Sequence, residues 1–218
     1  FSDYVLTAAV SVSAGTAAIV SAFPVLAGYD VPIDLIVLFG MLMLINLRGV
    51  RESSNAFVIP TYAFLFGVLA LIITGVWRSM YDSSYLVHPD SMVRQPLDWA
   101  MLFLSLRAFA NGCSSMTGVE AIADSVPMFH RPEARNAAVT TYWMAGILGF
   151  MVIGITYLIM HYHVMPIEEV TAMSQLAEQV FGRSAAYFYL QITTMLVLYL
   201  AANTAYNGLP LLLSIVAT

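Results

Sequence analysis

Long apolar runs separated by short polar connections dominate the chain. A helix needs about 20 mostly apolar residues to cross the hydrocarbon core of a bilayer, whereas the strands of a membrane barrel need about ten alternating residues. The runs here are continuous and have the helical length. We therefore predict an all-α integral membrane protein whose spanning helices cover residues 1–23, 31–47, 55–77, 99–129, 137–161 and 185–209.

The fourth run, residues 99–129, is interrupted by the small and polar stretch 110–118. Glycine lowers the cost of leaving helical geometry. Non-helical backbone at membrane depth is tolerated only where it is buried in protein or lines a cavity. We therefore predict a broken helix, with Gly112, Cys113 and Gly118 at the break.

Residues 167–181 show a different pattern, because apolar side chains recur there at helical spacing with acids and glutamines between them. The segment is too short and too polar to span a bilayer. We predict an external amphipathic helix that lies over the bundle. Pro210 is expected to bend or end the last spanning helix.

Composition supports this assignment, because 60% of the residues are hydrophobic and 10% are charged, against about 25% charged in soluble domains. Two short connections carry Arg48, Arg51, Arg131 and Arg135, which places them in the cytoplasm by the positive-inside rule. No basic stripe indicates a nucleic-acid partner. The sequence starts at Phe1 without a targeting segment, and we expect it to be an internal piece of a longer protein.

Three oxygen-bearing side chains, Asp3, Thr7 and Ser11, follow one another at intervals of four residues. This spacing puts them in one row along a helix. Carboxylate and hydroxyl oxygens are ligands for hard cations. Helix packing is the alternative, because Ser11 and Gly15 also fit a close contact between helices.

A second group lies beside the predicted break and contains Thr117, Glu120 and Asp124. A carboxylate inside a membrane is expensive and usually functional. Glu120 is therefore a candidate ion ligand, proton carrier or both. The alternatives are a structural ion pair of Glu120 with Arg107, and for Asp124 a solvated vestibule or an ion pair with Arg131 or Arg135.

Catalytic and cofactor signatures are missing from the sequence. It contains no phosphate-binding glycine motif, no metal-ligand spacing and no Ser–His–Asp set, and its 1 cysteine cannot form an internal disulfide. We therefore expect no enzyme and no resident cofactor. His161 and His163 flank Tyr162, which favours an aromatic belt at the membrane surface over a metal site.

Several motifs resemble permeases of the amino acid–polyamine–organocation (APC) superfamily, and their combination resembles the branch of KUP-type potassium transporters. The motifs are DYVLTAAVSVSAG (3–15), NLRGVRES (46–53), GCSSMTGVEA (112–121), PEARNA (132–137) and LAANTA (200–205). The resemblance implies a LeuT-type inverted-repeat fold, of which this chain is a fragment covering about transmembrane helices 3–8. It also implies that the residues matching potassium-site positions are Asp3, Thr7, Ser11, Thr117 and Glu120.

We interpret the chain as part of a secondary active transporter in the plasma membrane that imports potassium, in symport with protons carried by Glu120 or Asp3. The partners are then the potassium ion, the proton, membrane lipid and a second copy of the protein contacted through regions outside this chain. A proton-coupled amino acid permease of the same superfamily is the first alternative. A membrane sensor or scaffold with the same fold is the second.

Overall fold

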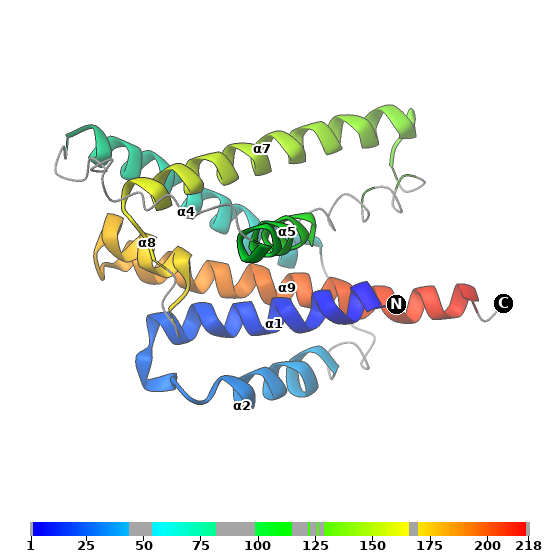
Figure 1. The fold of residues 1–218 in the computed structure, drawn as a ribbon. Helices are drawn as coiled ribbons and strands as arrows, with labels where there is room; N and C mark the ends of the chain where they lie inside the picture. Colours follow the sequence, from blue (N-terminus) through cyan, green and yellow to red (C-terminus); the bar gives the residue numbers. More distant parts are fainter. Residues whose placement is uncertain are drawn as a thin grey trace. The chain divides into compact units, whose positions relative to one another are not determined.

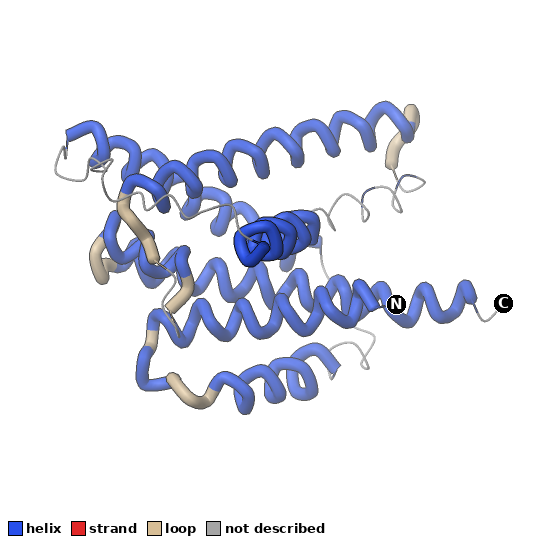
Figure 2. The backbone as a smooth tube through the Cα atoms, viewed as in Figure 1, coloured by secondary structure: helices blue, strands red, loops and turns tan. Residues whose placement is uncertain are grey.

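Figure 1 shows a computed structural model of the chain that describes residues 2–43, 54–81, 99–114, 122, 126, 129–165 and 170–216. These residues form helices and connecting loops, with no sheet among them, as Figure 2 shows. The chain divides into two compact units, Phe1–Ser83 with Thr156–Thr218, and Ser84–Ile155.

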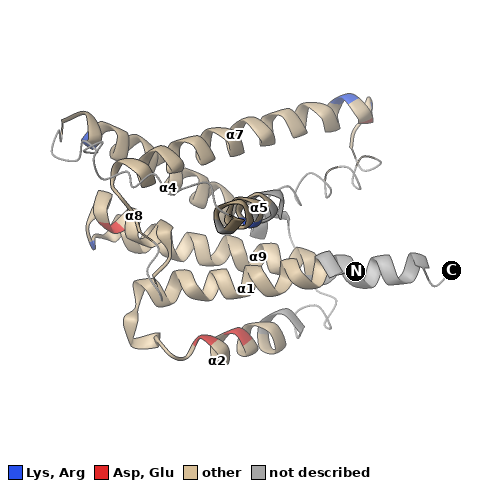
Figure 3. Cartoon of the chain, in the orientation of Figure 1, with Lys and Arg blue, Asp and Glu red and all other residues tan. Residues whose placement is uncertain are grey.

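Helix α1 (Ser2–Ala22) and helix α9 (Ala185–Val216) pair along much of their length and form the centre of the first unit. Neither helix carries a charged side chain beyond Asp3, and Figure 3 shows their described parts free of charge. A near absence of charged side chains suits helices surrounded by other helices and lipid. Helix α9 does not end at Pro210, because helical backbone continues to Val216.

The second predicted span is present as helix α2 (Asp30–Leu35), continued by a π-helical stretch, η2 (Ile36–Met43). A 3-10 turn, η1 (Pro24–Leu26), joins it to α1. Val12 of α1, Val37 of η2, and Tyr199 and Ala202 of α9 form a buried apolar cluster. This cluster joins α1 and η2 to α9, which is far from both in the sequence.

Helix α4 (Ser54–Tyr81) packs against the opposite side of α9, and two glycines mark its close approaches. A Cβ on Gly67 would lie 3.0 Å from Leu190, and one on Gly75 would lie 2.8 Å from Leu158. Leu158 belongs to the end of helix α7 (Glu133–His161). Tyr162 follows α7 and donates a hydrogen bond to the Gly75 carbonyl at 3.2 Å.

The external amphipathic helix is α8 (Ala172–Phe181), which begins later than the predicted residue 167. Its start follows from an N-cap, because the Thr171 hydroxyl accepts a hydrogen bond from the Ser174 amide at 3.1 Å. Gly182 ends it at φ 63°, a value that favours glycine. Leu176, Ala177 and Val180 are buried, so the apolar face packs inward.

The second unit contains helix α5 (Trp99–Ser114) and most of α7. Among the described residues, four helices are long and apolar enough to cross a membrane, namely Tyr4–Ala22, Val58–Tyr81, Glu133–His161 and Ala185–Ala205. The predicted spans at 31–47 and 99–129 are described only in part.

Candidate functional site

The predicted row of oxygen ligands lies on α1, beside the face that α1 buries. Ala8 and Val12 are buried at 8% and 1% exposure, whereas Thr7 and Ser11, each one position earlier in the sequence, are half-buried. Asp3 lies in the first turn of the helix. Thr7 and Ser11 therefore lie beside the contact between α1 and α9, and helix packing leaves both side chains partly exposed.

Gly15 follows Ser11 at the same four-residue spacing, and the side chain of Tyr199 lies against it. A Cβ on Gly15 would lie 2.6 Å from Cε1 of Tyr199. The Tyr199 hydroxyl is 3.0 Å from Oγ1 of Thr16, and both side chains are buried. Gly15 thus allows the aromatic ring to lie directly against the backbone of α1.

The second predicted group is described only in part. Gly112 and Cys113 have helical backbone within α5, which extends to Ser114. Thr117, Gly118, Glu120 and Asp124 lie outside the described residues. Helix α1 and helix α5 belong to different compact units. That the two groups form one site therefore stays a prediction. A break at Gly112 and Cys113 is not present, because α5 continues through both residues, whereas a break at Gly118 stays a prediction.

A polar cluster that the sequence analysis did not single out joins α1, α8 and α9 at one end of the first unit. The Tyr187 hydroxyl donates to the Ser21 carbonyl at 3.1 Å and lies 2.7 Å from the Ser174 hydroxyl. Because Tyr187 has one proton, Ser174 must be the donor in the second bond. The Thr171 amide donates to the Ser21 hydroxyl at 3.1 Å.

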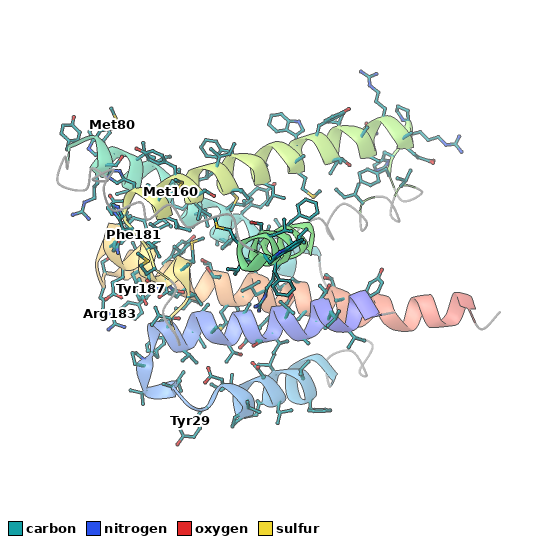
Figure 4. All side chains as sticks on the ribbon, in the orientation of Figure 1. Tyr29, Met80, Met160, Phe181, Arg183 and Tyr187 are labelled. Carbon is teal, nitrogen blue, oxygen red and sulfur yellow. The ribbon has the colours of Figure 1, made fainter. Side chains whose placement is uncertain are left out.

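The sequence indicated that these tyrosines need partners, but it could not show which residues they contact. A buried tyrosine hydroxyl needs a partner, and both Tyr187 and Tyr199 interrupt the apolar pattern of α9. Spacing along one helix cannot show which distant residue supplies that partner. Figure 4 shows Tyr187 and Arg183 near the start of α9, close to Phe181 at the end of α8.

The sequence analysis also missed two further buried polar groups, one on α9 and one on α2. Gln191 of α9 is 1% exposed, and neither its amide oxygen nor its amide nitrogen has a hydrogen-bond partner among the described residues. Oδ1 of Asp34, on α2, is buried without a hydrogen bond in the same part of the chain. Buried polar atoms usually find partners in native structures.

The described part of the site offers hydroxyl oxygens, not a transition-metal centre. No three His, Cys, Asp or Glu side chains gather at metal-binding distance within the described ranges. Hydroxyl and carboxylate oxygens in one row favour a hard cation.

The model of the amino acid permease family matches residues 1–217. This chain belongs to the amino acid permease family. The permease is also 42% identical over 208 residues to "Potassium transporter KimA" of Bacillus subtilis (strain 168). The match covers 95% of this chain and 34% of that relative, so the chain spans about a third of the relative's length.

These findings confirm the resemblance to the superfamily that the motifs indicated. Together with the four apolar helices, they make this permease a multi-pass protein of the plasma membrane. Permease and transporter both name carriers of solutes, which agrees with the expectation of a protein without enzymatic activity.

Proposed function

We propose that this chain is part of a secondary active transporter that imports potassium in symport with protons. The observation that carries the proposal is the 42% identity to a protein named a potassium transporter, over 95% of this chain. The row of Asp3, Thr7 and Ser11 on α1 adds the required chemistry, and Thr7 and Ser11 are half-buried beside the buried face of the helix. All three side chains are carried by α1, and α1 packs against α9.

In the proposed site, two acids supply negative charge and three hydroxyls supply neutral oxygens. The acids are Asp3 and Glu120, and the hydroxyls are those of Thr7, Ser11 and Thr117. Backbone carbonyls freed at a break beyond Ser114, near Gly118, add further neutral oxygens. Potassium is a large cation that holds its water weakly compared with smaller cations, so many neutral oxygens and few charges suit it.

Coupling to protons follows from the chemistry of a carboxylate inside a membrane. Desolvation favours the protonated form of a carboxyl group, whereas a bound cation favours its ionised form. Potassium and a proton then compete for the same carboxylate. A carrier that exposes this group alternately to the two sides of the membrane can thereby couple the two fluxes.

The proposed architecture is a LeuT-type inverted repeat, in which this chain supplies about helices 3–8. In such folds the substrate site lies near the bilayer midplane between the repeats. Thr7 and Ser11, which are half-buried on α1, then face a segment outside this chain that supplies the other half of the site. Membrane lipid, and a second copy of the protein bound through regions outside this chain, complete the proposed partners.

A proton-coupled amino acid permease is the second candidate, because the matching family bears the name amino acid permease. Such a carrier uses the N-termini of half-helices to hold the substrate carboxylate. Its site needs hydrogen-bond donors facing the substrate, whereas Asp3 would repel a carboxylate. The acidic row on α1 therefore favours a cation.

The proposal is tested by growth of a bacterium that lacks its own potassium uptake systems. The full-length parent protein is expressed as wild type, as Glu120→Gln and as Glu178→Gln, in which an exposed acid on α8 is replaced. We expect wild type and Glu178→Gln to restore growth at low potassium, and Glu120→Gln to fail at equal expression. No rescue by well-expressed wild type would contradict the proposal, and uptake of amino acids would then be measured.

A further inference from the structure

Tyr199 takes the place of a fourth side chain in the oxygen row of α1. Asp3, Thr7, Ser11 and Gly15 recur at intervals of four residues, and the last of them has no side chain. A Cβ on Gly15 would lie 2.6 Å from Cε1 and 2.8 Å from Cδ1 of Tyr199. These distances are too short for real contacts, so the edge of the ring fills the space where that side chain would be.

The tip of the same ring is fixed by a hydrogen bond. The Tyr199 hydroxyl lies 3.0 Å from Oγ1 of Thr16, whose side chain is 1% exposed. In surroundings of low dielectric such a bond is stronger than in water. The ring also belongs to the buried apolar cluster with Val12, Val37 and Ala202. It is therefore held at its edge by the backbone at Gly15 and at its hydroxyl by Thr16.

The fixed ring lies one helical turn from Ser11, the last oxygen ligand of the row. We propose that Tyr199 is the wall that ends the cation-binding row beside Ser11, and that the Thr16 hydroxyl keeps this wall in position. The inference rests on the proposed binding of cations at the row. It makes Tyr199 a specificity-determining residue and Thr16 a positioning residue, neither of which needs to touch the ion through an oxygen.

A rigid wall limits how large a cation the row accepts. Potassium binds with its oxygen ligands at the proper distance, whereas rubidium and caesium need more space in the same row. Freeing the ring weakens the binding of potassium, because the ligands are less well preorganised. It also lowers discrimination against the larger cations. The effect therefore falls on affinity and selectivity more than on the maximal rate.

The test uses the purified full-length parent protein in liposomes, with potassium uptake measured as a function of concentration and with rubidium or caesium as competitors. We expect Thr16→Val and Tyr199→Phe each to raise KM for potassium about three- to tenfold, the factor that one net hydrogen bond represents. Vmax stays within about twofold, because the variants remove uniform binding. Thr16→Ser keeps the hydroxyl and restores the wild-type KM.

Two comparisons separate this role from general destabilisation. Thr194→Val is the matched control, because the Thr194 hydroxyl donates at 2.7 Å to the Leu190 carbonyl of its own helix. It should leave KM and the competition by caesium unchanged. The double variant Thr16→Val/Tyr199→Phe should bind potassium no more weakly than either single variant, because both remove the same bond.

The outcomes distinguish this inference from the proposed function. If wild type transports potassium but Thr16→Val behaves like Thr194→Val, the role of Tyr199 as a wall is refuted. The proposed function as a potassium transporter is then unaffected. Variants with lower Vmax and unchanged KM, or losses that add in the double variant, also refute it. If well-folded wild type transports no potassium, the proposed function and this inference fail together.

Discussion

The Tyr187 hydroxyl of α9 donates a hydrogen bond to the Ser21 carbonyl, 3.1 Å away at the end of α1. The last carbonyls of a helix have no partner within that helix. A side chain from a helix 166 positions later therefore completes the end of α1. The next carbonyl, of Ala22, accepts from the Arg183 guanidinium at 3.4 Å.

Replacing Tyr187 by phenylalanine should lower the stability of the full-length protein by about 1–3 kcal/mol, because a buried carbonyl loses its donor. The measurement is the apparent Tm of the purified protein in detergent. Tyr157→Phe is the control, since that hydroxyl makes an exposed contact of 3.3 Å with Ser79. We expect the control to stay within about 0.5 kcal/mol of wild type. Equal effects of the two substitutions would show that the Tyr187 hydroxyl does not cap α1.

Gly15→Ala should destabilise the protein by about 1–3 kcal/mol, because the new methyl group overlaps the Tyr199 ring and forces α1 and α9 apart. The distance from that Cβ to the ring would be 2.6 Å. Gly146→Ala on α7 is the matched control, since no described atom lies within 4 Å of a Cβ there. The control should be neutral or stabilising by up to about 1 kcal/mol, from helix propensity.

The same variants are compared by apparent Tm and by the yield of monodisperse protein after purification. A stable Gly15→Ala variant would mean that the close approach of α1 and α9 at this position is absent from the full-length protein. Restoration of stability by a smaller residue at 199, as in Gly15→Ala/Tyr199→Leu, would locate the overlap at the ring.

The attachment of α8 should depend more on Ser174 than on the ion pair between Glu178 and Arg183. The pair is 3.8 Å long, with both side chains about half exposed, and exposed ion pairs contribute about 0–1 kcal/mol. Ser174 is 0% exposed and bonds to Tyr187 at 2.7 Å. We expect Ser174→Ala to cost about 1–2 kcal/mol and Glu178→Gln less than about 0.5 kcal/mol.

The two variants are compared by the rate of limited proteolysis at the connections of α8. Apparent Tm is the second measurement. The reverse order, with Glu178→Gln cleaved faster than Ser174→Ala, would contradict the hydrogen-bonded attachment. High salt should leave the wild-type cleavage rate almost unchanged, because screening weakens only the exposed pair.

The arginine distribution predicts that α7 runs from the cytoplasm to the outside. Arg131 is 95% exposed just before α7, and Glu178 is exposed on α8 beyond its other end. Single cysteines at these positions are tested in a full-length parent in which Cys113 and any other cysteine are replaced. A membrane-impermeant maleimide should label Glu178→Cys on intact cells and Arg131→Cys only after permeabilisation. Labelling of both on intact cells would show that α7 does not cross the membrane.

Local pattern was enough to predict most helices of the described chain, because apolar runs of spanning length can only be satisfied as helices in lipid. The differences lie at the ends of elements. Thr171 caps α8, which delays its start, and α4 continues to Tyr81, beyond the predicted residue 77. Such boundaries depend on single hydrogen bonds and on neighbours that hydropathy does not register.

The sequence by itself determined the membrane class, the four-residue spacing of Asp3, Thr7 and Ser11, and the kinship with permeases, since these follow from composition, periodicity and motifs. Only the tertiary structure decided which face of α1 is buried and which partners its polar groups find. Thr16 and Tyr199 are separated by 183 positions. Their pairing depends on how α1 packs against α9, and no periodicity within either helix specifies that contact.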